Sequence, residues 1–268
     1  MTIATAAQRL ERTAPLLGGF NLEFLLIEFK RRLRNRRTLI FTIVMPVALF
    51  LIVGLPLKAI PLTSTPIAAG GPSVAAYIMI SMAVYGAMVA STAAGGAVAI
   101  ERASGWSRQL RLTPLNPVAY IAMKVISALV LGLISVVATF LAGAIVGVTI
   151  SVETMVIAGL VAWLGSLVFT ALGLFIGYLV PTDNVMQFLG PLLAILALFG
   201  GLFTPLNNFP EVVQNIAKFT PVYGLGELAR APLTGQVFDA AALLNIVAWI
   251  IIFGVGAALA FRRDTKRV

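Results

Sequence analysis

The sequence contains no cysteine and no histidine. Disulfide bonds, thiolate nucleophiles, haem ligation by histidine and most zinc sites need one of these residues and are excluded. Charged residues are also scarce, at 11% of the chain against about 25% in a soluble globular domain. This scarcity of charge points away from a soluble fold.

Catalytic and nucleotide-binding signatures are missing as well. The dipeptide Gly-Lys does not occur, so the chain has no Walker A sequence and cannot bind ATP through a P-loop. We expect all ten carboxylates at or beyond the membrane interfaces, with no acid–base pair among them. An intramembrane enzyme or a proton-driven carrier would lack its usual groups.

What the sequence does hold is apolar residues, which make up 60% of the chain and come in long runs. A helix needs about 20 apolar residues to cross a bilayer, and the alternation of a membrane barrel is absent. Helices satisfy their own backbone groups in lipid. The sequence therefore predicts an all-α membrane protein with six transmembrane helices, at about 38–57, 73–100, 118–148, 155–179, 185–204 and 239–261.

The net charge of +9 is distributed unevenly along the chain. Once the six spans are threaded, sixteen of the nineteen Lys and Arg residues fall on one side, and only Lys58, Lys218 and Arg230 fall on the other. The positive-inside rule then places both termini in the cytoplasm of a cell with a plasma (inner) membrane. The basic charge thus reports topology, and no nucleic-acid partner is expected.

Three regions follow from this threading. Residues 1–19 are expected to form a cytosolic tail, 20–37 an amphipathic interfacial helix, and 38–268 the six-helix transmembrane domain. Within the last region, 101–117 is a cytosolic segment. Lys124 is expected to snorkel from the third span to the inner surface.

Residues 205–237 are neither a span nor an ordinary loop. Asn208 and Glu211 fit a capping box, and Thr220-Pro221 would stop the helix that they begin. A second short helix is expected at about 223–231. We interpret 205–237 as external re-entrant helices that dip into the outer leaflet before the last span.

Three segments in this order resemble the ABC-2 family of ATP-binding-cassette transporter permeases. They are the amphipathic helix with its Arg-rich end, the stretch Glu101-Arg102…Gly105…Leu110…Thr113-Pro114-Leu115, and the run Phe203-Thr204-Pro205-Leu206…Phe209-Pro210…Thr220-Pro221. The resemblance covers nearly the whole chain from Phe20 onward. Trp106 departs from the small or polar residue that is common in the family.

The resemblance implies a permease that pairs with a second permease chain, the same or related, and with two cytosolic ATPase subunits. ATP and Mg would be used by those partners, with no cofactor bound by this chain. In the family, the first helix and the segment after the second span contact the ATPases. That role is carried onto Phe29, Arg32, Arg36, Glu101, Arg102, Gly105, Trp106 and Arg108.

Other patterns suggest a substrate route, although most such stripes are only helix packing. Met and aromatic side chains suit an amphiphilic cargo, and the candidates are Tyr85, Met88, Thr92, Phe188 and Phe199. The candidates for an external gate, equally readable as a structural cap, are Phe209, Pro210, Phe219 and Glu227. Gly143-xxx-Gly147 and Gly173-xxx-Gly177 are interpreted as close helix contacts.

The function favoured by the sequence is the transmembrane subunit of an ATP-driven exporter of a drug, a lipid-like molecule or a peptide antibiotic. The chain itself is not expected to be an enzyme. An ion-coupled secondary transporter or channel without an ATPase partner is the main alternative. A membrane-bound transferase is a third reading, against which the missing catalytic side chains speak.

Overall fold

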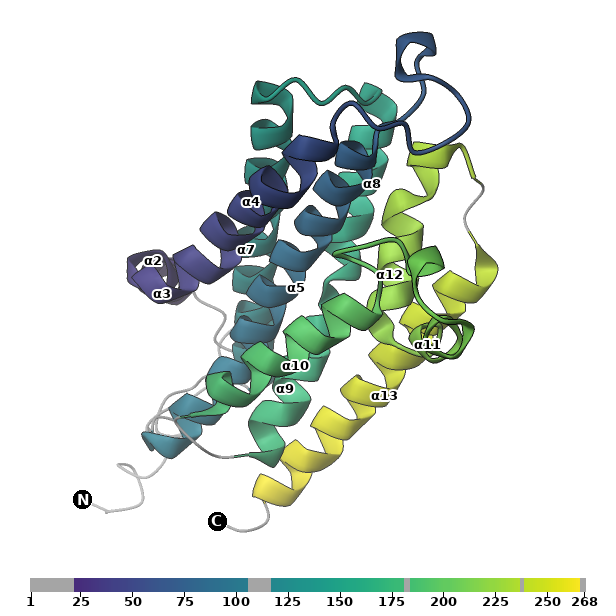
Figure 1. Cartoon of the computed structure of the whole chain (residues 1–268). Coiled ribbons are helices and arrows are strands. Elements are labelled where there is room, and N and C mark those ends of the chain that lie inside the picture. The colour runs from purple at the N-terminus through teal and green to yellow at the C-terminus, as the bar shows by residue number, and fades with distance from the viewer. Residues whose placement is uncertain (1–21, 106–116, 181–183, 237–238, 266–268) are drawn as a thin grey trace, which may run out of the picture.

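The computed structural model describes residues 22–105, 117–180, 184–236 and 239–265 (Figure 1). This part of the chain is helical and contains no β-strand. Five helices are long and apolar enough to cross a bilayer, at Arg36–Leu57, Val74–Ala103, Val118–Ile145, Val152–Leu179 and Ala240–Arg263. The sixth expected span, 185–204, is represented by the shorter apolar helix α10 (Val185–Phe199).

The first long helix is irregular. It joins α3 (Arg36–Leu39) and α4 (Met45–Leu49) through the π-helical segment Ile40–Val44, and a second π-helical segment, Phe50–Gly54, follows. Pro46 lies between these two segments, and a proline lacks the N–H that a regular helix needs. The distortion that a proline causes in a helix is thus accommodated by wider helical turns on both sides of Pro46.

The helix α5 (Val74–Ala103) occupies the centre of the bundle. Its apolar window is 89% buried, against 22–39% for the other four long helices. It packs mainly on α7 (Pro117–Ile145) and α9 (Leu167–Leu179). A Cβ atom at Gly173 of α9 would collide with the backbone of α5, so the two helices touch backbone to backbone there.

The two small-residue motifs differ in what they do. Gly173 and Gly177 both face α5, as expected for a close helix contact. Gly143 lies against Met79 of α5, whereas Gly147 follows the end of α7 with φ +74° and lies beside the Lys58 ammonium. Lys58 Nζ donates to the Val146 carbonyl at 2.8 Å, which satisfies the end of α7.

The helices α8 (Val152–Gly165) and α9 form one span with a break at Ser166. The Ser166 side chain is fully buried; it donates to the Trp163 carbonyl at 2.6 Å and lies 2.9 Å from Ser91 Oγ of α5. A serine that bonds back to its own helix is a common cause of such bends. Ser166 also marks the middle of the 28-residue span Val152–Leu179.

Two short helices precede the last span, close to where the sequence places them. They are α11 (Glu211–Ala217) and α12 (Pro221–Arg230), followed by the 3₁₀ turn Ala231–Thr234. The expected capping box is wrong, because Pro210 stands at the N-cap of α11 and Asn208 belongs to the preceding turn. Thr220 caps α12, and its Oγ1 accepts from the Tyr223 N–H at 3.3 Å, so Thr220-Pro221 begins a helix as well as ending one.

The last helix, α13 (Ala240–Thr265), runs along α9. Phe253 stacks on Phe175, and Phe261 meets Tyr178 edge-on. The helices α5, α9 and α13 finish at the same end of the bundle, where α7 begins (Figure 1). We call this the basic end, because Arg102, Arg262 and Arg263 lie there, and the opposite end the far end.

Candidate functional site

The helix α2 (Leu22–Arg34) crosses the side of the bundle rather than running along it (Figure 1). The most deeply buried side chains of this amphipathic helix are charged rather than apolar. Leu26 and Leu33 are exposed, while Glu28 and Arg32 are more than nine-tenths buried. The charged side chains on this face must therefore find partners inside the protein.

Those partners come from α5 and α7. Lys124 Nζ lies 2.7 Å from Glu28 Oε1 and 2.5 Å from Glu101 Oε1. Arg32 Nη2 reaches Glu28 at 3.0 Å, and Arg31 Nη2 reaches Glu101 at 2.5 Å. These five side chains form what we call the ion cluster. It ties α2 to the last turn of α5 and to the first turns of α7.

The ion cluster satisfies most of its charge internally. The Tyr120 hydroxyl donates to the second oxygen of Glu101, and Arg32 also donates to the Ala94 carbonyl at 3.4 Å. Burial raises the pKa of the Glu28 carboxyl, but the facing charges of Lys124, Arg32 and Arg31 outweigh burial and hold that pKa below its ordinary value. Glu28 is therefore an ionised partner and not a stored proton at neutral pH.

The end of α5 carries a second set of contacts. Arg102 Nη1 donates to the Gly177 and Tyr178 carbonyls at 3.1 and 2.8 Å, which caps α9, and its guanidinium lies over the Tyr178 ring. Gly105 follows α5 with φ +75°, a conformation that favours glycine. Arg102 therefore joins the end of α5 to the end of α9.

The expected ATPase-coupling residues thus divide into three groups. Arg32 and Glu101 are buried in the ion cluster, where Arg32 binds Glu28 and Glu101 binds Lys124. Arg36 is exposed, Phe29, Arg102 and Gly105 are partly exposed, and Trp106 and Arg108 lie outside the described residues. The group available to a partner is therefore smaller than the group in the sequence motif.

The structure also places the substrate and gate candidates. Tyr85, Met88 and Thr92 are buried in α5, whereas Phe188 and Phe199 on α10 are 65% and 39% exposed. Phe209 and Glu227 are half-buried, and Pro210 and Phe219 are exposed. A common route through both substrate sets stays a prediction.

The two short helices α11 and α12, which together we call the hairpin, are held at the turn between them and at the end of α12. At the hairpin's tip, Asn245 Nδ2 and Trp249 Nε1 of α13 donate to the Lys218 and Phe219 carbonyls, each at 2.9 Å. At its other end, buried Arg230 binds Glu227 at 2.7 Å and Ser81 Oγ at 3.2 Å, and lies over the Tyr77 ring. The hairpin is thereby attached to α13 and to α5.

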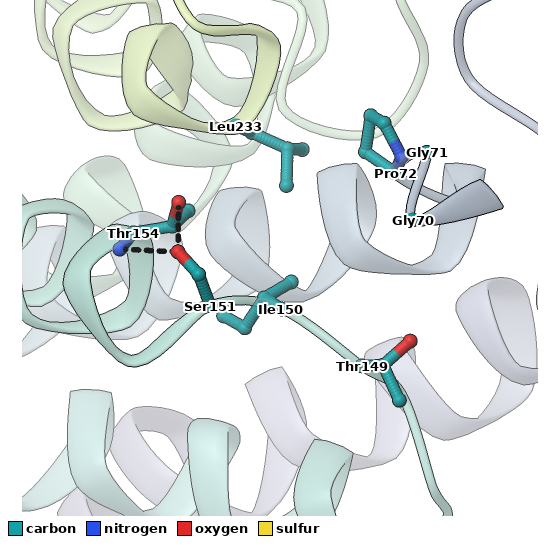
Figure 2. A pocket seen from close by; sticks show the side chains of 8 residues that line it. All are labelled: Gly70, Gly71, Pro72, Thr149, Ile150, Ser151, Thr154 and Leu233. Carbon is teal, nitrogen blue, oxygen red and sulfur yellow. Dashed lines mark hydrogen bonds between the residues drawn. The ribbon is translucent and has the colours of Figure 1, made fainter. Parts of the chain in front are cut away.

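A shallow cavity of about 330 Å³ lies at the far end (Figure 2). Its lining combines loop residues with hydroxyls, and Ser151 Oγ accepts from the Thr154 N–H at 3.0 Å. No ionisable side chain and none of the expected site residues lines it. The lining residues are Gly70, Gly71, Pro72, Thr149, Ile150, Ser151, Thr154 and Leu233.

Comparison with known proteins decides the family. The family model described as "ABC-2 type transporter" matches residues 24–234, from the ion cluster through the hairpin. The chain belongs to the ABC-2 type transporter family. A protein of Bacillus subtilis (strain 168) with the name "Putative transport permease YvfS" is 28% identical over 228 residues, which cover 84% of this chain and 90% of that protein.

Membership identifies the class of molecule. This ABC-2 protein is a membrane-embedded permease, the transmembrane subunit of an ABC transporter that associates with ABC ATPase partners. In this class, ATP is hydrolysed by separate ATPase subunits rather than by the permease.

Several residues of the site escaped the sequence analysis. Lys124 was expected to snorkel to the surface, but it is 1% exposed and held by two carboxylates, so that expectation is wrong. Glu28 stands four residues before Arg32, a spacing that predicts an ion pair within the helix, and that pair is present. Its second role, the contact to Lys124 across 96 positions, has no local signal in the sequence.

Proposed function

We propose that this permease exports an amphiphilic or hydrophobic cargo, such as a drug, a lipid-like molecule or a peptide antibiotic, out across a bacterial plasma membrane. It works with a second permease chain, the same or related, and with two cytosolic ATPases that use ATP and Mg. Both termini are cytoplasmic, so the basic end faces the cytosol. The helix α10 serves as a sixth, shortened crossing, and the hairpin re-enters from the outside.

The ion cluster carries this proposal. It links α2 to the ends of α5 and α7 at the basic end, where family members meet their ATPases. Closure of a nucleotide-bound ATPase dimer would push on the segment after Gly105. Because α2, α5 and α7 are joined by buried charges, they would move together and rock the bundle between two packings.

Polar groups on the outer surface of this single chain support a second permease chain. The helix α10 has 15 residues and is about 22 Å long, short of the roughly 30 Å hydrocarbon core. It is followed by irregular backbone with exposed Thr204, Asn207 and Asn208. Irregular backbone is tolerated at membrane depth only against protein or a water-filled cavity. A facing permease that encloses such a cavity meets this requirement.

The buried acids Glu28 and Glu101 favour one alternative, transport driven by an ion gradient. In such a carrier a carboxylate would gain and lose a proton during turnover. Both are bound to cations here, and the low pKa of Glu28 opposes protonation. ATP-driven transport fits these contacts better.

The test is transport by the permease reconstituted in vesicles with its ABC ATPase partner. Transport should require ATP and should stop when the Walker A lysine of the ATPase is replaced. Gly105→Val should uncouple hydrolysis from transport, because valine opposes φ +75° at this joint.

Gly70→Val is the matched control. Gly70 also has a positive φ and open space around it, but it lies in the far-end loop. Transport that persists without the ATPase, or equal effects of the two variants, would overturn the coupling assignment.

A further inference from the structure

The tip of the hairpin lies at an unexpected depth in the bundle. Asn245, which binds the Lys218 carbonyl, precedes Phe253 by eight residues, or about 12 Å along α13. Phe253 stacks on Phe175 of the parallel helix α9, so the same step along α9 leads to residue 167. Lys218 is therefore level with the break at Ser166, the middle of the span Val152–Leu179.

The contacts between α12 and α8 also place the tip of the hairpin deep in the bundle. Near the far end of α8, Thr154 Oγ1 donates to the Pro232 carbonyl at 3.3 Å. Further down, Leu225 packs against Gly165. Because α12 runs antiparallel to α8, residues before Leu225 lie still closer to the basic end. Figure 1 shows α11 well below the far ends of α7 and α8.

At this depth Lys218 turns outward from the chain. Its side chain is exposed, and Nζ donates to Asn215 Oδ1 at 3.1 Å. No carboxylate of the described residues lies within ion-pair distance of it, and Glu211, on the same helix, is seven residues away. Beside it Phe219 is 77% exposed and Ile216 is 58% exposed.

A cation at membrane depth is costly and marks a working position. Lys218 cannot face acyl chains there, and the proposed cavity between two permeases supplies the water that it needs. An ammonium beside an exposed phenyl ring and an aliphatic side chain complements a molecule with an anionic head and an apolar body.

We propose that Lys218, with Phe219 and Ile216, binds the anionic group of an amphiphilic cargo near the middle of the transport route. This inference rests on the proposed function and adds the charge of the substrate. Asn215 holds the ammonium in position, and the two apolar side chains contact the tail.

The activity test compares dodecyl phosphate, dodecyl maltoside and dodecyltrimethylammonium as stimulators of ATP hydrolysis by the reconstituted complex. Dodecyl phosphate should stimulate at the lowest concentration. Lys218→Gln should raise its half-maximal concentration about tenfold and leave the maltoside unaffected, and Lys218→Arg should restore it. Lys30→Gln removes an exposed cation at the basic end and should change nothing.

The binding test uses the absence of cysteine from the chain. Lys218→Cys should react with a sulfonatoethyl thiosulfonate added from outside, and dodecyl phosphate should slow that reaction. Leu164→Cys puts a thiol at the same depth on an exposed apolar face and should not react. An aminoethyl thiosulfonate should return dodecyl phosphate stimulation to the Lys218→Cys complex.

The outcomes of these experiments distinguish a failure of the anion site from a failure of the proposed export function. Equal shifts for all three amphiphiles, or a thiol that does not react, would overturn the anion site while ATP-driven export stands. An effect of Lys218→Gln that appears only in vesicles containing phosphatidylglycerol, without added amphiphile, would reassign the site to a lipid head group. Transport that needs no ATPase would overturn the export function, and the thiol protection would still report the site.

Discussion

Lys124 lies between two carboxylates, and each of the three side chains is more than nine-tenths buried. Lys124→Met would leave Glu28 and Glu101 facing each other with less positive charge. Removing one partner of a buried ion pair costs about 3–5 kcal/mol of unfolding free energy. Thermal unfolding in detergent should show this loss.

Lys30→Met is the control for Lys124→Met, because Lys30 is exposed on α2. Its unfolding free energy should change by no more than about 0.5 kcal/mol. Equal stability of the two variants would mean that the ion cluster does not hold α2 in place.

Acid should weaken the same cluster through Glu28. The pKa of this carboxyl is lower in the folded protein than its ordinary value of 4.5, so its stabilisation is complete above pH 4.5 and is lost as the pH falls through the folded pKa. Lys124, Arg32 and Arg31 face this group, with Glu101 and Tyr120 close by. The chain has no histidine, so little change is expected between pH 5 and 8.

The measurement is unfolding against pH for the protein and for Glu28→Gln. The variant starts less stable but should lose less stability below pH 4.5. Parallel curves for the two proteins would show that Glu28 contributes nothing to the acid transition.

At the scale of elements, the close contact of α5 with α9 depends on glycine residues, which have no side chain to keep the two backbones apart. Gly173→Ala should push the two backbones apart, and such overpacking costs about 1–3 kcal/mol. Gly254→Ala in α13 is the matched control, since nothing lies within 4 Å of the added methyl group. Thermal unfolding should separate the two variants, and a neutral Gly173→Ala would contradict the close packing.

The long helices were predictable from the sequence because an uncharged run of twenty or more apolar residues is the pattern of a transmembrane helix and of few other structures. The sequence also predicted the existence of α11 and α12 from their turn residues. It could not predict their depth, since the pattern of a seven-residue helix is the same at a surface and inside a bundle. Depth here is set by distant donors, Asn245 and Trp249 on α13.

The candidate site was predictable only in part for a similar reason. Glu101 and Arg32 belong to recognisable segments. A lone lysine near the end of a span, in contrast, fits two interpretations equally well, an ammonium that reaches the surface or one that is buried in an ion pair. Lys124 is paired because α2 brings Glu28 beside it. Only the crossing of three helices distinguishes the two readings.

At the scale of the whole molecule, the proposed topology can be tested with single cysteines in a chain that has none. Ser64→Cys lies in the exposed far-end loop and Ser104→Cys at the exposed basic end. A membrane-impermeant maleimide added to intact cells should label the first and not the second. Labelling of Ser104→Cys alone would invert the orientation and place the ion cluster outside.

The enclosure of α5 has a consequence for biosynthesis. This helix has the lowest mean hydropathy of the five long helices, 1.8 against 2.2–2.6, and it is also the most enclosed. It leaves the ribosome before α7 and α9, the neighbours that later surround it. The helix α5 is therefore synthesised before the neighbours that bury it, and its contacts with α9 can form only after α9 has been made.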